Sequence, residues 1–228
     1  ALAAAKLSEG RDRPRRVGFI GTGLIARYIH TFLAGTGWSF DEVGVFDTHA
    51  DSATGFSGYL TGSGQDATTV TVHDSAESLI RASDLVVFAT VAGTPHIHDP
   101  AWFDHHPVVL HVSLRDLDPQ ILLGAVNIVD DVEHCLKANT SPHLVEQLTG
   151  NRDFLDGTLD DVMSGKVTVP PDKTVVFSPF GLGGARSGRR QGRVRPRAAV
   201  GRADCHPPGS STTSAGTADR STPRAWRR

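Results

Sequence analysis

Short runs of mostly apolar residues alternate with segments of helical spacing through the first part of the chain. Apolar positions three or four residues apart predict helices over 24–33 and 74–82, and a Ser/Gly-rich helix or turn leads through residue 60. The apolar runs predict six strands, at residues 17–20, 43–46, 69–72, 85–91, 108–113 and 125–129. The run 85–91 is apolar throughout, as expected when helices cover both faces of a parallel sheet. The pattern therefore predicts an α/β fold with a doubly wound parallel sheet, the Rossmann arrangement.

The pattern changes after residue 138. Residues 140–148 open with capping residues and predict a helix, a polar stretch continues through 154, and a second helix begins at 158 or 160 and ends at 164. Residues 173–177 predict a seventh strand. We therefore divide the chain into four parts: a remnant helix and lead-in at 1–15, a nucleotide-binding domain at 16–138, a segment returning toward a second domain at 139–183, and a tail at 184–228.

The first strand runs directly into a glycine-rich turn, Gly21-x-Gly23-x-x-Ala26, which opens the first long helix. In a dinucleotide-binding turn the first glycine permits the tight turn, and the second lets the backbone approach a pyrophosphate. The third small residue lets the helix lie close to the sheet. The pyrophosphate would bind the free N–H groups at the helix N-terminus.

An acid, Asp47, ends the second strand a little over twenty residues past the first glycine, where it can accept hydrogen bonds from the ribose hydroxyls of adenosine. A 2′-phosphate would meet a like charge there, and no Arg follows in residues 48–51, so NAD is favoured over NADP. The alternative is a glycine turn in an ordinary α/β domain, with Asp47 capping the next helix. The expected cofactor site comprises strand-end and turn residues: Gly21, Thr22, Gly23, Leu24, Ile25, Asp47, Thr90, Val91, Ser113 and Gly181.

Other candidate chemistry is sparse. Histidines gather at 96, 98, 105, 106 and 111, but they do not complete a zinc pattern, so a solvated loop is favoured over a metal site and no metal is expected. Asp116 and Asp118 follow the fifth strand, where catalytic acids often lie, and capping of a helix that begins at Pro119 is the alternative role. The sequence contains no Gly-x-Ser-x-Gly turn and no Lys-terminated phosphate loop.

Composition is that of a globular protein. The chain has 228 residues, of which 39% are hydrophobic, and no apolar run approaches the ~19 residues of a membrane helix. Its first residues do not match a signal peptide. Two cysteines, Cys135 and Cys205, form no disulfide framework, which favours a cytoplasmic location.

The net charge of −2 is the sum of an acidic first part of the chain and a basic tail. Residues 184–228 contain eleven arginines against two aspartates, and they lack Leu, Ile, Phe, Tyr and Met. Such a segment cannot bury enough apolar surface to offset the entropy of ordering, so we expect it to be disordered. Its codons can be chosen so that another reading frame encodes an amphipathic helix, and we therefore expect this tail to have been read out of frame. Nucleic-acid binding by the arginines is the less favoured alternative.

Several motifs resemble the ornithine cyclodeaminase/μ-crystallin family, and more narrowly its 2,3-diaminopropionate branch. The resemblance covers residues 1–183, and the matching stretches are Gly18-Phe-Ile-Gly-Thr-Gly-Leu-Ile-Ala26, Ser113-Leu-Arg-Asp-Leu117, Asn127-Ile-Val-Asp-Asp-Val-Glu-His134, Asn139-Thr-Ser141 with His143-Leu144 and Glu146-Gln147, Asn151-Arg-Asp-Phe154 and Phe177-Ser-Pro-Phe-Gly181.

The resemblance implies a nicotinamide-dependent oxidation at a carbon that bears an amine, followed by hydrolysis of the imine. In this branch, which serves siderophore and antibiotic synthesis, N-(2-amino-2-carboxyethyl)-L-glutamate would yield 2,3-diaminopropionate and 2-oxoglutarate. Cyclodeaminases carry Gly-Ala-Asp-x-Pro-Gly-Lys-x-Glu-Leu after the fifth strand, and residues 112–117 lack a counterpart of that aspartate. Ring closure to proline is therefore disfavoured. Asp116 takes the place of the glutamate and is the candidate catalytic acid or orienting group.

Family members also carry a substrate domain before the glycine-rich turn and form homodimers. The resemblance implies that most of the substrate domain, with the dimer interface, is missing from this chain. We therefore expect the chain to bind NAD but to be inactive, with a small amino-acid substrate and no membrane partner in the full-length relative. A cyclodeaminase-like enzyme and a non-catalytic, μ-crystallin-like nicotinamide-binding protein are the alternatives.

Overall fold

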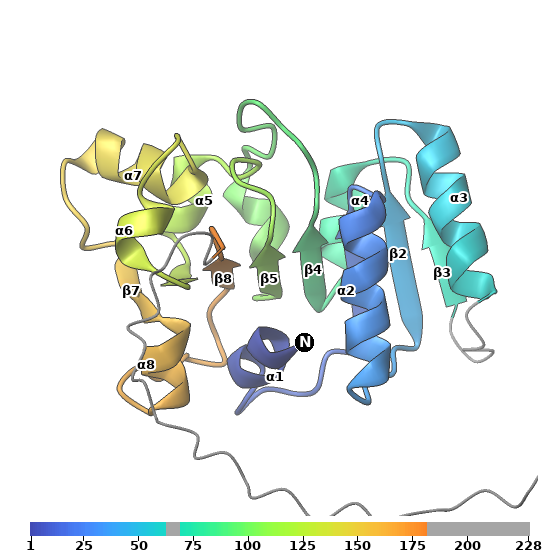
Figure 1. Ribbon diagram of the computed structural model, residues 1–228, viewed down its shortest axis with the longest axis horizontal. Coiled ribbons are helices and arrows are strands. Elements are labelled where there is room, and N and C mark those ends of the chain that lie inside the picture. The colour runs from blue at the N-terminus through green and yellow to red at the C-terminus, as the bar shows by residue number, and fades with distance from the viewer. Residues whose placement is uncertain (63–68, 182–228) are drawn as a thin grey trace, which may run out of the picture. The chain divides into compact units, whose positions relative to one another are not determined.

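Eight parallel strands form a single sheet in the computed structural model, which describes residues 1–62 and 69–181 (Figure 1). The strand order is β3-β2-β1-β4-β5-β8-β6-β7. The strands are β1 (Arg16–Ile20), β2 (Glu42–Phe46), β3 (Thr69–Val72), β4 (Leu85–Phe88), β5 (Val108–His111), β6 (Val126–Val129), β7 (Leu155–Thr158) and β8 (Val175–Ser178). The predicted doubly wound α/β fold is confirmed.

Helices connect most consecutive strands, as parallel pairing requires. They are α1 (Leu2–Leu7), α2 (Leu24–Gly35), α3 (Ala50–Thr61), α4 (Ala76–Ala82), the 3-10 helix η1 (Pro100–Phe103), α5 (Pro119–Leu123), α6 (Val132–Cys135), α7 (Ser141–Thr149) and α8 (Leu159–Met163). Side-chain caps begin several of them, including Ser75 for α4 and Asp118 for α5. Within the residues that the structure describes, no helix is long and apolar enough to cross a membrane.

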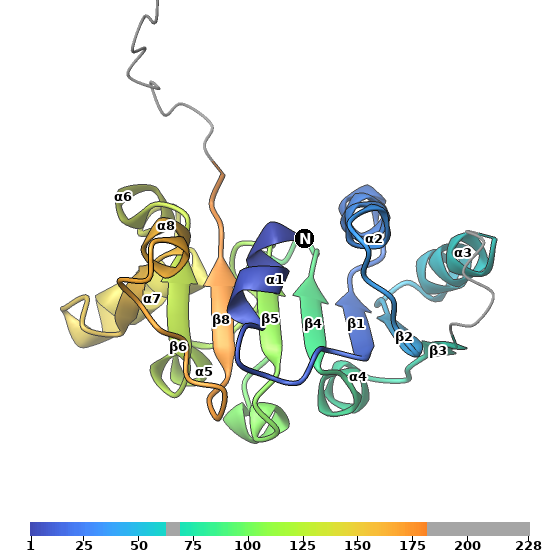
Figure 2. The same ribbon diagram turned by 90° about the horizontal axis from the view of Figure 1, so that it is seen from below.

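Helices lie on both faces of the sheet (Figure 2), and an apolar layer packs between the helices and the sheet on each face. Residues from α1, α2, α3 and α8 pack on one face, and residues from α4, η1, α5 and α7 pack on the other. Successive residues of a strand point to opposite faces, so Val87 joins the first layer while Val86 and Phe88 join the second. The central strands therefore need apolar residues at every position, which is why their runs could be recognised in the sequence.

Two predicted strands end earlier than expected. The run 85–91 forms a strand only to Phe88, and the run 108–113 only to His111. In both, the residues beyond the strand enter loops at the carboxyl edge of the sheet. The segment that was expected to be a helix or a turn after β2 is the helix α3.

The segment 139–183 contributes two strands to the same sheet. The predicted strand at 173–177 is observed as β8, which lies between β5 and β6. The sequence did not predict β7, because its residues Leu-Asp-Gly-Thr are polar and only partly buried at an edge of the sheet. The predicted tail at 184–228 lies outside the described residues.

Candidate functional site

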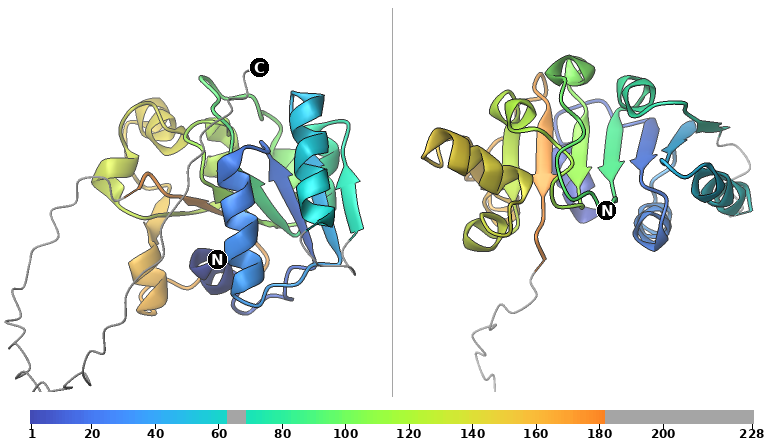
Figure 3. Two further views of the ribbon diagram at one scale, coloured as in Figure 1. Left: turned by 45° about the vertical axis from the view of Figure 1, so that its right-hand side comes forward. Right: turned by 90° about the horizontal axis from the view of Figure 1, so that it is seen from above.

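A cavity of about 530 Å³ opens at the carboxyl ends of β1, β2 and β4. These three strands are neighbours in the sheet, and the view from above in Figure 3 looks onto this edge. The cavity is lined by Ile20, Gly21, Thr22, Gly23, Phe46, Asp47, Thr48, His49, Ser52, Ala89, Thr90, Val91, Ala92 and His96. The connection from β1 to β2 runs through α2 on one face of the sheet, and the connection from β3 back to β4 runs through α4 on the other face. This reversal of strand order at β1 and β4 makes the edge the switch point where ligands bind open α/β sheets.

The turn after β1 has two glycines with different constraints. Gly21 has φ +84°, and a Cβ there would lie 2.6 Å from the backbone oxygen of Ala89. Gly21 is therefore required by the fold itself. Gly23 is the N-cap of α2, and a Cβ on it would meet nothing within 4 Å. The open space over Gly23 and the free N–H groups of the first helical turn leave room for a ligand.

Asp47 ties the end of β2 to this turn. Its Oδ2 accepts hydrogen bonds from the backbone N–H (2.9 Å) and the hydroxyl (2.8 Å) of Thr22, and its Oδ1 accepts one from the N–H of His49 (2.9 Å). Burial opposes the charge, but the hydrogen bonds from His49 and Thr22 lower the pKa of Asp47 below its ordinary value. The carboxylate is thus ionised at neutral pH. It has about four acceptor positions, so one remains for a ligand hydroxyl.

The alternative role of Asp47 as a helix cap is present only in part. His49 is the N-cap of α3 and makes no side-chain cap, while Asp47 holds the His49 N–H from two residues before. Asp47 therefore orders the entry to α3 and the glycine turn together.

The loop after β4 forms the opposite wall of the cavity. Val91 is fully exposed, and no packing within the described chain accounts for its apolar side chain. The Thr90 hydroxyl points away from solvent and donates a hydrogen bond to Asp116 Oδ1. The backbone N–H of Ala92 donates to the Thr90 hydroxyl oxygen at 3.2 Å, which fixes the turn of the loop.

Asp116 lies behind this wall with no exposed surface. In addition to the Thr90 hydroxyl, it faces His96 Nε2, 3.0 Å from Oδ1, and His111 Nε2, 3.2 Å from Oδ2. Burial disfavours the carboxylate, but the hydrogen bonds from His111 and His96 hold the pKa of Asp116 far below its ordinary value. Asp116 is therefore charged at neutral pH. It cannot supply a proton, so of the two roles predicted for it the geometry supports the orienting one.

Two loops lie side by side behind the cavity. Ile97 and Leu117 form a parallel β-bridge, so residues 96–98 run alongside 116–118. The bridge pairs His96 with Asp116 and also His98 with Asp118, whose Nδ1 and Oδ2 lie 3.2 Å apart. The two pairs differ in burial, since His98 is largely exposed and does not line the cavity. Asp118 also caps α5 by accepting the Gln120 N–H, as the alternative reading of that residue predicted.

The structure brings most of the predicted cofactor residues to one place. Gly21, Thr22, Gly23, Asp47, Thr90 and Val91 line the cavity, and Leu24 lines a smaller adjoining one of about 310 Å³. Three others do not line either cavity. Ile25 is exposed on α2, Ser113 is buried beyond β5, and Gly181 donates its N–H to Asp130 at the end of β6.

Sequence reasoning missed His96 as part of the site. It was grouped with the other histidines as a solvated loop, yet it lines the cavity with a side chain that is 40% exposed. The available signal was the position of His96 shortly after the run 85–91, at the same edge as Gly21. Among the described residues, no group of three or more His, Cys, Asp or Glu side chains is arranged to hold a metal ion.

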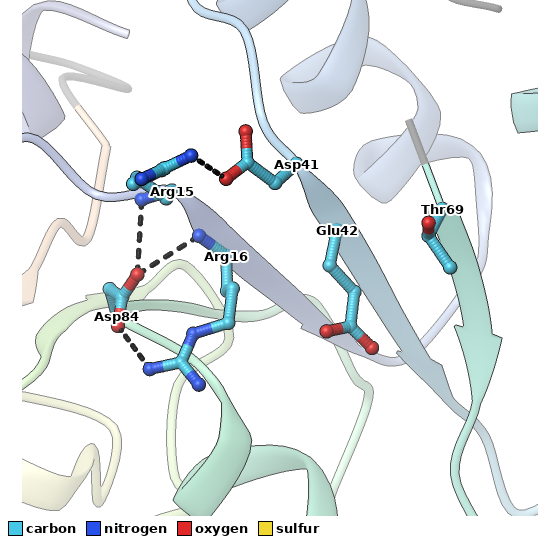
Figure 4. Close-up of a pocket in the computed structure, with 6 residues that line it drawn as sticks. All are labelled: Arg15, Arg16, Asp41, Glu42, Thr69 and Asp84. Atoms are coloured by element: carbon cyan, nitrogen blue, oxygen red, sulfur yellow. Dashed lines mark hydrogen bonds and ion pairs between the residues drawn. The ribbon is translucent and has the colours of Figure 1, made fainter. Parts of the chain in front are cut away.

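A second cavity, of about 580 Å³, lies at the opposite edge of the sheet (Figure 4). Four of its charged groups form two ion pairs: Arg15 Nη2 lies 2.5 Å from Asp41 Oδ2, and Arg16 Nη2 lies 2.8 Å from Asp84 Oδ1. The fifth, Glu42, accepts a hydrogen bond from the Thr71 hydroxyl at 2.6 Å. The backbone N–H groups of both arginines also donate to Asp84. These contacts fix the start of β1 beside the start of β4. The polar groups of this cavity hold neighbouring strands together, so we do not interpret it as a binding site.

The fold is a Rossmann-like nucleotide-binding fold, and the cavity occupies the position at which such folds bind their ligands.

Comparisons with known proteins give the same fold. No family model and no curated protein matches the chain. Among solved structures, the Δ1-pyrroline-2-carboxylate reductase of Thermococcus litoralis, in complex with NADH and L-proline, is similar over 78% of this chain and 57% of its own, with 18% identity and a TM-score of 0.69. CmnK is 33% identical over 79% of this chain and 56% of its own, with a TM-score of 0.64.

A probable ornithine cyclodeaminase from Bordetella pertussis is 20% identical over 79% of this chain and 58% of its own, with a TM-score of 0.64. The chain thus spans a little over half the length of each of these proteins. The two at or below 20% identity are evidence of the fold alone.

Proposed function

We propose that the chain is the NAD-binding domain of an oxidoreductase of the ornithine cyclodeaminase/μ-crystallin family. The observation that carries the proposal is the cavity at the switch point, where Gly23 leaves open space above a helix N-terminus and Asp47 stands ionised at the end of β2. The similar reductase from Thermococcus litoralis, described in complex with NADH and L-proline, supports a nicotinamide cofactor and an amino-acid substrate class.

The residues present fit the dinucleotide. Asp47 would hold the adenosine ribose, the N–H groups of the turn 21–24 would hold the pyrophosphate, and the loop 89–92 would face the nicotinamide. When bound, the cofactor accepts a hydride from the substrate carbon. The protein binds and orients the cofactor, and the walls of the cavity keep water from the side of the cofactor that they cover.

The finer assignment is to the 2,3-diaminopropionate branch, with N-(2-amino-2-carboxyethyl)-L-glutamate as substrate of the full-length relative and 2,3-diaminopropionate and 2-oxoglutarate as products. It rests on the motifs at 113–117, 127–134, 139–141, 151–154 and 177–181. The identity to CmnK, 33%, is higher than the 18% and 20% identity to the other two proteins described above. We also propose a homodimer and a cytoplasmic location for that relative.

The cofactor preference tests the proposal on the chain itself. Titration of residues 1–228 with NADH and NADPH should show tighter binding of NADH, by about tenfold or more, because the Asp47 carboxylate repels a 2′-phosphate. Replacing Asp47→Ser together with Thr48→Arg should bring the two affinities within about threefold of each other.

The exposed acid Asp153 provides the matched control, and Asp153→Ser should leave both affinities unchanged. Thermal melts of each variant are needed because Asp47 also holds Thr22 and His49. Equal or tighter binding of NADPH by the unmodified chain would overturn the NAD assignment, and binding of neither would overturn the proposed function.

A further inference from the structure

We propose that His96, held by Asp116, is the proton-binding residue of this site, placed at the nicotinamide end of the cavity to accept the proton that amine oxidation releases. This inference rests on the proposed function. It assigns a role to a side chain that the glycine turn and the adenosine-binding acid do not involve.

The position of His96 follows from the strand order. Asp47 follows β2, the glycine turn follows β1, and the strand order is β2-β1-β4. A dinucleotide whose adenosine lies at Asp47 and whose pyrophosphate lies at the glycine turn therefore continues toward the end of β4. The cavity wall at that end is the loop after β4, which contains Thr90, Val91, Ala92 and His96. The titratable residues lining the described cavity are Asp47, His49 and His96, and the first two lie at the adenosine end.

Asp116 fixes the imidazole of His96. An ionised carboxylate only accepts hydrogen bonds, so His96 Nε2 carries the proton in the 3.0 Å contact and Nδ1 is the nitrogen left to take up another. Asp116 is itself held by Thr90 and His111 and has no exposed surface. A buried acid that holds a partly exposed histidine in this way fixes the orientation and the tautomer of the ring.

The proton balance of the reaction gives such a group a role. When an amine is oxidised to an imine, the C–H bond breaks and its electron pair leaves as hydride to the nicotinamide ring. The N–H bond then breaks, its electron pair forms the second C–N bond, and its proton passes to Nδ1 of His96. The side chain is 40% exposed, so the proton can pass on to solvent.

The charges around His96 give a test that requires no turnover. With His96 neutral, the His96–Asp116 pair carries one negative charge and attracts the cationic ring of NAD⁺, and protonation of His96 removes that attraction. The ring of NADH is neutral. His111 reaches the pair only through Asp116, and Asp47 and His49 face the adenosine, which is the same in both cofactors.

The experiment measures the dissociation constants of NAD⁺ and NADH for residues 1–228 between pH 6 and pH 8.5. The ratio of the NAD⁺ constant to the NADH constant should rise by about three- to tenfold as the pH falls, and it should be independent of pH in His96→Gln. His98→Gln and His49→Gln are the matched controls. His98→Gln removes the exposed His98–Asp118 pair next to His96, and His49→Gln removes a histidine at the adenosine end of the cavity. Both should keep the pH dependence of the unmodified chain.

The imidazole proton resonances of His96 provide a second readout. Saturation with NAD⁺ should lower the midpoint of the His96 titration relative to saturation with NADH, which follows from the same linkage. If both cofactors bind but the ratio is independent of pH, or is unchanged in His96→Gln, the inference fails while the proposed function stands. If neither cofactor binds, both fail.

Discussion

At the scale of single residues, Asp116 shows how the fold sustains a charge without solvent. Its carboxylate is fully buried, yet Thr90 and His96 from the loop after β4 and His111 from the end of β5 all donate to it. Charge-assisted hydrogen bonds of this kind are stronger than neutral ones, and together they offset the cost of burial. Loss of the charge would leave these three donors facing a weaker acceptor with fewer acceptor positions.

Replacing Asp116→Asn should therefore lower the free energy of unfolding at pH 7 by about 1–3 kcal/mol. The pKa of Asp116 is depressed in the folded protein, so its contribution is present above the ordinary pKa of an aspartate, about 3.9, and is lost as the pH falls below that value. Urea unfolding at pH 7 and at pH 3 should show a difference between the two proteins that shrinks at the lower pH.

Asp118→Asn is the control for this substitution. Asp118 caps α5 from a partly exposed position, and asparagine is an equally good cap, so the change should cost no more than about 0.5 kcal/mol. An Asp116→Asn protein as stable as the unmodified chain at both pH values would show that the buried charge contributes nothing.

At the scale of elements, the turn between β1 and α2 contains two glycines with different roles: Gly21 is required for the fold, and Gly23 is expected to be required for binding. Gly21→Ala should destabilise the protein by about 1–3 kcal/mol, because it combines a positive φ with a Cβ 2.6 Å from the Ala89 oxygen. Gly23→Ala should cost no more than about 1 kcal/mol, since nothing lies within 4 Å of its Cβ. It should nevertheless weaken NADH binding by about tenfold or more.

Thermal or urea unfolding and NADH titration of both variants check this prediction. The expected pattern is a less stable Gly21→Ala and a stable, poorly binding Gly23→Ala. If Gly23→Ala bound NADH as the unmodified chain does, the pyrophosphate would not approach the backbone at this turn.

The elements that the sequence predicted share a physical cause. β1, β4 and β5 are covered on both faces, so most of their positions are apolar and they form recognisable runs. β7 was missed because it pairs with β6 at the edge, where Asp156 and Gly157 are tolerated. The insertion of β8 between β5 and β6 depends on pairing between distant segments, which no local pattern encodes.

The same limit applies to the site. Gly21 and Asp47 could be found because each stands at a fixed place relative to a strand and a turn. The position of His96 after a strand was the only local signal for it, because the partner that orients it, Asp116, lies 20 residues away in another loop. Ser113 was placed at a strand end on the same argument as Thr90, but β5 is one strand farther from the glycine turn than β4.

At the scale of the whole molecule, the two edges of the sheet differ in how their polar groups are used. At the amino edge, both arginines of the second cavity are paired with aspartates (Figure 4). At the carboxyl edge, Asp47 retains an acceptor position, Gly23 leaves open space and His96 is partly exposed. We therefore expect the dinucleotide to bind at the carboxyl edge of the sheet.

Backbone amide chemical shifts of residues 1–228, recorded during titration with NADH, test this claim most directly. If NADH binds at the carboxyl edge, saturable chemical-shift changes should be concentrated at residues 21–24, 47–49 and 89–96, with little change at Arg15, Arg16 and Asp84. Shifts concentrated at the amino edge, or the absence of saturable shifts at millimolar NADH, would contradict it.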